Sequence, residues 1–250
     1  RLNYDPSFHN QFPESIIWMD HHIQKRVAKI APKAWDAICE VVGGEKMIEK
    51  RTMGIESKHF TQINSFLWSD AFIINFHMEE NEAWHPPQAE GFNWHKDGSY
   101  FRHFCDSPEQ ALLLVILWKD VETQGGGTFL ALDSPYVTAK TLLEHPEGLD
   151  PSNFNFGAMI KECSEFIEIT GNAGDLFIIH PYMLHASSRN NSGKPRIMSN
   201  PPLVLTKPLR LDRSLNDLSL LEEATLNFLG LDYWHPPAPS LRKSYWWVVN

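Results

Sequence analysis

The spacing of apolar residues in the first forty-odd positions predicts helices. These residues recur at intervals of three and four and are Ile16, Ile17, Met19, Ile23, Val27 and Ile30. Pro32 can open a second helix that stops at Gly43 and Gly44, because proline fits a first helical turn and glycine favours a helix end. We therefore expect residues 1–45 to form helices that pack outside the main core.

Farther along, the pattern changes to short β-branched and aromatic runs bounded by Gly, Pro, Asn or Asp, which predict strands. The runs are Ala71 to His77, Ala111 to Trp118, Thr128 to Leu132, Phe166 to Thr170, Asp175 to His180 and Ile197 to Leu205. One helix is expected between them, capped by Ser134 and ending before Pro146, and another from Leu218 to Leu229. Short strands in series, with helices gathered mainly at the N-terminus, predict a mainly β jelly-roll or barrel core with helical support.

Composition fits one globular domain. The chain has 250 residues, of which 42% are hydrophobic, and no low-complexity linker divides it. We expect a single domain over residues 1–250, with helical support over 1–45, a core over 66–206 and a C-terminal extension over 207–250. The excess of 31 acidic over 22 basic residues speaks against nucleic acid as a partner. No apolar run approaches the roughly 20 residues of a membrane span, so no membrane partner is expected either.

Cysteine usage points to a reducing compartment. Only Cys39, Cys105 and Cys163 occur, and the absence of a C-x-x-C pair excludes a disulfide scaffold or a thiolate zinc site. The expected location is the cytoplasm. Because the sequence begins at Arg1 without an initiator methionine, a removed targeting segment stays an open alternative.

Three His-x-carboxylate tripeptides are candidates for chemistry, where composition alone predicts about 1.5. His145/Glu147 follows a helix end and is expected at the surface. His77/Glu79 ends a strand and runs into further glutamates, which favours a solvated loop, so it is a minor candidate. His95/Asp97 is followed by Gly98, and an extended segment would place both side chains on one face with Lys96 on the other. This third pair suits a metal.

A third ligand is available after the strand at 175–180. His180 and His185 flank Pro-Tyr-Met-Leu, and Arg196 follows His185 by 11 residues. Two histidines and one carboxylate leave three metal positions open, as in Fe(II) oxygenases that bind a cosubstrate and O₂ together. The alternative is that His185 merely ends a strand and Arg196 is a surface cation.

These residues resemble a known family. His95-x-Asp97, the run Gly174-Asp-x4-His180-Pro-x3-His185-x-Ser187 and Arg196 are similar to the phytanoyl-CoA dioxygenase-like branch of the Fe(II)/2-oxoglutarate oxygenases. The resemblance covers roughly residues 66 to 206. It implies a double-stranded β-helix, also called a jelly-roll, with iron inside one open end.

The resemblance also implies roles for individual residues. His95, Asp97 and His185 would bind iron, and Arg196 would hold the far carboxylate of 2-oxoglutarate. Ser187 matches a position that touches the same carboxylate. Trp118 matches a tryptophan that lines the cosubstrate pocket, and Thr128 lies near a position that contacts 2-oxoglutarate, although core packing explains both equally well. His180 would be a supporting partner of the ligands rather than a ligand.

The implied activity is oxidation of a substrate C–H bond with Fe(II), 2-oxoglutarate and O₂, supported by ascorbate, with hydroxylation, desaturation or ring closure as outcomes. Where the family commonly has Pro-Gly-Ser-His, this chain has Ala131-Leu132-Asp133-Ser134-Pro135, so we expect a small metabolite or natural-product intermediate rather than phytanoyl-CoA. The loop from Tyr100 to Pro108, with Trp84 and Trp94, is expected either to line its pocket or only to pack. An acyl-CoA hydroxylase, a non-catalytic metal-binding jelly-roll and a protein hydroxylase are the alternatives.

Overall fold

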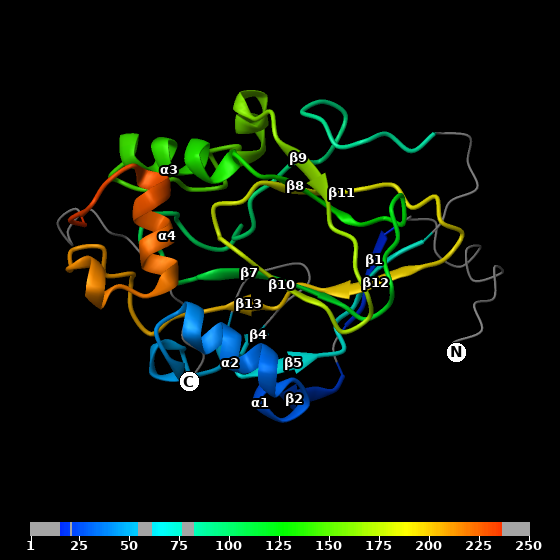
Figure 1. The fold of residues 1–250 in the computed structure, drawn as a ribbon, viewed down its shortest axis with the longest axis horizontal. Coiled ribbons are helices and arrows are strands. Elements are labelled where there is room, and N and C mark those ends of the chain that lie inside the picture. The colour runs from blue at the N-terminus through cyan, green and yellow to red at the C-terminus, as the bar shows by residue number, and fades with distance from the viewer. Residues whose placement is uncertain (1–15, 21, 55–61, 77–82, 237–250) are drawn as a thin grey trace.

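The computed structural model describes the chain except residues 1–15, 21, 55–61, 77–82 and 237–250 (Figure 1). A larger antiparallel sheet has the strand order β1-β6-β12-β7-β10, with β13 also paired to β7. Its strands are β1 (Ile16–Trp18), β6 (Ile73–Asn75), β7 (Leu112–Leu117), β10 (Leu176–Ile179), β12 (Arg196–Ser199) and β13 (Pro202–Leu203). A second sheet has the order β11-β8-β9, from β8 (Thr128–Ala131), β9 (Phe166–Glu168) and β11 (His185–Ser187). Together the antiparallel sheets form a mainly β, jelly-roll-like core.

Two small ladders and the helices complete the described fold. The ladders pair β2 (Gln24–Arg26) with β5 (Leu67–Ser69) and β3 (Met53–Gly54) with β4 (Gln62–Ile63). The helices are α1 (Val27–Ile30), α2 (Pro32–Val41), α3 (Ser134–Glu144) and α4 (Leu220–Leu229), with short 3₁₀ turns at Glu45–Met47, Phe156–Glu162 and Leu215–Asp217. In Figure 1, α3 and α4 lie together at one end of the molecule, and α1 and α2 lie along one side. No helix of the described segments has the length and apolarity needed to cross a membrane.

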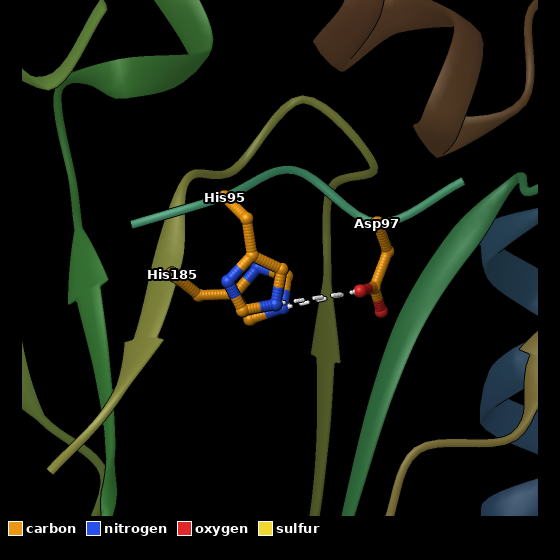
Figure 2. Close-up of side chains that lie close together, drawn as sticks. All are labelled: His95, Asp97 and His185. Atoms are coloured by element: carbon orange, nitrogen blue, oxygen red, sulfur yellow. Dashed lines mark ion pairs between the residues drawn. The ribbon is translucent and has the colours of Figure 1, made fainter. Parts of the chain in front are cut away.

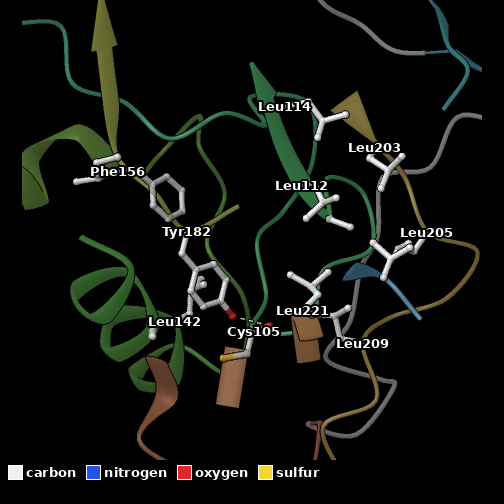
Figure 3. Packing of buried hydrophobic residues seen from close by; sticks show 14 of the residues in the cluster. Cys105, Leu112, Leu114, Leu142, Phe156, Tyr182, Leu203, Leu205, Leu209 and Leu221 are labelled. Carbon is white, nitrogen blue, oxygen red and sulfur yellow. Dashed lines mark hydrogen bonds between the residues drawn. The ribbon is translucent and has the colours of Figure 1, made fainter. Parts of the chain in front are cut away.

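The strand β7 separates two apolar clusters. All six of its residues are buried, so successive side chains point into different packed layers. Leu112 and Leu114 belong to the larger cluster, which reaches Leu203 of β13 (Figure 3). Leu113 and Val115 face the smaller cluster, which includes Leu130 of the second sheet. The odd-numbered face of β7 therefore looks into the space between the two sheets.

The larger cluster also binds the helices to the sheets. Trp35 and Ile38 of α2, Leu142 of α3 and Leu221 of α4 all join it. Tyr182 lies at its centre, where its hydroxyl donates a hydrogen bond to the carbonyl oxygen of Cys105 (Figure 3). The segment between β10 and β11 is thus fixed by packing against the helical layer.

Most of the predicted elements are confirmed, including the helix from Pro32 that ends before Gly43 and the helix that stops at Gly230. Gly230 adopts a left-handed conformation (φ 67°), and Ser219 and Glu222 form a capping box at the start of α4. His77, expected to end a strand, lies outside the described residues.

Two expectations were wrong. The predicted helix over residues 16–30 is instead β1, β2 and the single turn α1. Tertiary pairing overrides the helical spacing, because β1 pairs with β6 and β2 pairs with β5. Ser134 is not the cap of α3, since Asp133 holds that position. The Ser134 hydroxyl instead donates to the Ala131 carbonyl (2.6 Å) and accepts from the Leu184 N–H (2.8 Å), which ties β8 to the segment before β11.

Candidate metal centre

His95 and His185 lie side by side because their backbones pair. The N–H of each residue donates to the carbonyl of the other at 2.9 Å, which makes an isolated antiparallel bridge. Directly opposed residues in such a bridge project their side chains to the same face. The two imidazole rings therefore lie with their centroids 4.3 Å apart (Figure 2).

Asp97 reaches the same point from two residues farther along. Its Oδ1 lies 3.7 Å from His95 Nε2 and 3.5 Å from His185 Nε2 (Figure 2). One ligand atom from each of the three residues lies within 4.8 Å of the others. Two imidazole nitrogens and a carboxylate oxygen at these separations suit one divalent transition metal, so the donor set fits iron.

Hydrogen bonds leave the Nε2 atoms of both rings directed at this point. His95 Nδ1 donates to the Asn93 carbonyl (2.9 Å), and His185 Nδ1 donates to the Met183 carbonyl (3.3 Å). A proton held on Nδ1 makes Nε2 the lone-pair nitrogen of a neutral imidazole. Both rings are thereby oriented as metal ligands.

The protonation states also favour a metal. Burial lowers the pKa of His95, and the neighbouring His185 lowers it further. Burial alone would raise the pKa of Asp97, but His185, His95 and a hydrogen bond from Gln110 outweigh it and hold the pKa below its usual range. At neutral pH the site therefore offers an uncharged His95 and an ionised Asp97, which are the forms that bind metal.

Lys96 points away from the ligands and anchors the segment. Its Nζ donates to His103 Nδ1 at 2.7 Å and lies 5.7 Å from the ring centroid of Phe156. Burial lowers the pKa of Lys96 to about 7. Gly98 follows with φ 103°, and a Cβ there would lie 2.4 Å from Phe101 Cε1, so only glycine fits this turn.

The three candidate ligands open into a cavity of about 230 Å³. Its lining includes two hydroxyl groups and a cation, namely Thr128, Ser187 and Arg196. Tyr100, Gln110 and Asn200 also line it, as do apolar side chains from the larger sheet, including Leu113 and Val115.

Arg196 is a buried cation at the start of β12, with 2% of its surface exposed. Its Nε donates to the Gly126 carbonyl (2.8 Å) and its Nη1 to the Ile73 carbonyl (3.4 Å). Within the described part of the chain, no carboxylate forms an ion pair with it, and burial lowers its pKa to about 10. A buried guanidinium without a counter-charge beside a cavity is suited to bind an anionic group.

Thr128 and Ser187 are also brought to this cavity. They are direct partners in the pairing of β8 with β11, which places them next to each other on the second sheet. The Thr128 hydroxyl donates to Met198 Sδ at 3.5 Å. Their position fits the expectation that they contact an anion held by Arg196, and their roles remain predictions.

Two expected positions were wrong. Trp118 does not line the cavity. Leu113 and Val115 face the cavity, whereas Trp118 lies beyond the end of β7 with the opposite parity, 38% exposed, and donates from Nε1 to Ser199 Oγ (2.9 Å). His180 does not support the metal ligands. Its Nε2 donates to Thr225 Oγ1 of α4 (2.9 Å), and it packs against Phe228.

Other candidates are placed as follows. His145 and Glu147 form an exposed ion pair at 2.9 Å, as the sequence predicts for a surface pair. His77 and Glu79 lie outside the described residues. Tyr100 lines the cavity, whereas Trp84 packs on Phe129 and Trp94 packs on Phe166. Gln110 and Asn200, which contact Asp97, carried no signal in the sequence, because lone amides occur throughout any chain.

Comparison with known proteins finds one matching family model and similar solved structures. The family model described as phytanoyl-CoA dioxygenase matches residues 36–198, which include His95, Asp97, His185 and Arg196. Among solved structures, one described as the crystal structure of EvdMO1 is similar at 12% sequence identity with a TM-score of 0.32, covering 74% of this chain and 46% of that chain. The chain thus spans less than half the length of that structure. No curated protein matches the sequence. The match over most of the chain shows that it belongs to the phytanoyl-CoA dioxygenase family.

Proposed function

We propose that this protein is an Fe(II)- and 2-oxoglutarate-dependent oxygenase that oxidises an unactivated C–H bond of a small molecule. One observation carries the proposal: three metal-ligand side chains and a buried cation without a counter-charge open into the same cavity. A metal site alone would have no use for the buried cation. A cosubstrate that binds the metal at one end and carries a second carboxylate at the other would use both the metal ligands and the buried cation.

His95, Asp97 and His185 would hold the iron, and Arg196 would bind the far carboxylate of 2-oxoglutarate with help from Thr128 and Ser187. Bound iron, together with 2-oxoglutarate and O₂, supplies an oxidant strong enough to remove hydrogen from carbon, with succinate and CO₂ as by-products. The protein itself orients the substrate and excludes water from the cavity. Because Asp97 fills the carboxylate position, no place is left for a halide, and oxidised rather than halogenated products are expected.

The lining of the cavity favours a small substrate. Its volume of about 230 Å³ lies below the range of roughly 300–1,000 Å³ typical of sites for drug-sized ligands. Arg196 is the one Lys or Arg among its described lining residues, and the cosubstrate would use it. A coenzyme A ester carries several phosphates, and the described lining has no further Lys or Arg to bind them. The lining therefore fits an uncharged metabolite or natural-product intermediate better than an acyl-CoA.

The test is a mass-spectrometric screen of metabolites with Fe(II), ascorbate and 2-oxoglutarate. We expect succinate to form and one compound to gain an oxygen atom or lose two hydrogen atoms. The His185→Ala variant should give neither product. If the wild-type protein binds iron but leaves 2-oxoglutarate unchanged under all conditions, the metal has a non-catalytic role and the proposal is wrong.

A further inference from the structure

The two carboxylate oxygens of Asp97 lie in different surroundings. Oδ1 faces the Nε2 atoms of both histidines, at 3.5 and 3.7 Å (Figure 2). Oδ2 accepts hydrogen bonds from Asn200 Nδ2 at 3.3 Å and from Gln110 Nε2 at 3.5 Å. One oxygen therefore points to the metal position, and the other is turned toward two amide donors.

Both amides are attached to the central strands of the larger sheet. Gln110 lies two residues before the start of β7 and is buried, and Asn200 directly follows β12. These two strands are paired neighbours. A donor placed at the end of a packed strand holds its position better than one on a free loop, so the pair can fix the rotation of the Asp97 carboxylate.

The rotation of this carboxylate decides how many positions it takes on a metal. A carboxylate can bind through one oxygen or through both. With two histidines and one oxygen of Asp97, three of six positions stay open, which is enough for a chelating cosubstrate and O₂. If both oxygens bound, only two positions would stay open. An amide N–H donates to the second oxygen and cannot itself bind a cation.

We propose that Gln110 and Asn200 are positioning residues that hold Asp97 as a one-oxygen metal ligand and so keep the third coordination position open. This inference rests on the proposed metal site. It adds to that site two uncharged side chains that do not bind the metal themselves but determine how Asp97 binds it.

The experiment uses Co(II) as the probe, titrated under nitrogen into the metal-free protein and followed by visible absorption. Gln110→Met and Asn200→Leu, singly and together, remove the donors with little change in volume. Loss of partners that orient a ligand typically weakens metal binding by roughly 10–100-fold. We expect that loss in the double variant, together with a changed cobalt d–d spectrum. Asn172→Leu is the matched control, because Asn172 is an exposed amide outside the lining of the cavity, and it should bind like the wild type.

Melting temperatures of the metal-free proteins show whether each variant folds. If the double variant does not fold, the Asn200→Leu protein alone carries the test, with about a tenfold weaker Co(II) affinity expected. Folded variants whose affinity and spectrum both equal those of the wild type overturn the inference while leaving the metal site intact. If the wild-type protein binds no Co(II), the proposed function itself fails, and the inference fails with it.

Discussion

Replacing Arg196 by methionine should weaken 2-oxoglutarate binding and leave the stability of the ligand-free protein nearly unchanged. The substitution keeps an unbranched side chain but removes the charge and both N–H donors that reach the Gly126 and Ile73 carbonyls. A loss of binding without a loss of stability makes this variant more informative than an activity loss alone.

The magnitudes follow from the surroundings of the guanidinium. A hydrogen bond to a charged group contributes about 1.5–3 kcal/mol, so affinity for 2-oxoglutarate should fall about ten- to a hundred-fold. Burial lowers the pKa of Arg196 from 12.5 to about 10, which sets its burial cost at about 3 kcal/mol. Its two hydrogen bonds to carbonyls also involve the charged group, and at about 1.5 kcal/mol each they offset about 3 kcal/mol of that cost. Because cost and offset are about equal, the melting temperature of the ligand-free variant should stay within about 2 °C of the wild-type value.

The assay is an anaerobic titration of the Fe(II)-loaded proteins with 2-oxoglutarate, followed by the iron charge-transfer band, with thermal unfolding measured separately without ligand. Arg196→Lys serves as the comparison, because it keeps the charge but loses the planar fork, and its affinity should be intermediate. Equal affinities in wild type and Arg196→Met would refute the assigned role. A melting temperature that falls by several degrees would show that the guanidinium mainly stabilises the fold and is not there to bind an anion.

Three further outcomes follow from the structure. His185→Ala should abolish iron binding, whereas His180→Ala should retain iron; metal analysis that finds the reverse contradicts the ligand assignment. Burial lowers the pKa of His180 to about 3, so between pH 6.5 and 3 the unfolded chain binds a proton that the folded protein does not, and the free energy of unfolding falls as the pH falls. His180→Gln should therefore lose about 2 kcal/mol less of this free energy than the wild type between pH 7 and 5, as measured by urea unfolding. Equal losses in both proteins would contradict this. The Tyr100 hydroxyl is buried without a hydrogen-bond partner, so Tyr100→Phe should raise the free energy of unfolding by about 1 kcal/mol, and a decrease would mean that the hydroxyl is satisfied.

The candidate metal site could be predicted from the sequence because two short segments carry its residues. The alternation of an extended chain places His95 and Asp97 on one face, and a connection of five residues after a strand leads to His185. The two segments meet through one long-range contact, the bridge between His95 and His185. This contact could still be expected from the sequence, because a shared metal needs both histidines at one point. Central strands such as β7 were equally clear, since a continuous apolar run between turn residues describes a strand buried on both faces.

What the sequence could not predict depends on partners far away in the chain. Ile16–Trp18 and Gln24–Arg26 form strands because β6 and β5 offer them edges for pairing, which no local spacing reveals. The error for Trp118 came from strand parity, which is fixed only when the register of β7 is known. His180 contacts helix α4 and not the metal ligands, because its ring forms a hydrogen bond with Thr225, which lies 45 residues later in the chain.

The most direct test is a crystal structure of the protein grown under nitrogen with Fe(II) and 2-oxoglutarate. The account predicts one metal ion bound by His95 Nε2, Asp97 Oδ1 and His185 Nε2, with the far carboxylate of 2-oxoglutarate on the guanidinium of Arg196 beside Thr128 and Ser187. An ion held by other residues, or a cosubstrate carboxylate that makes no contact with Arg196, would contradict it.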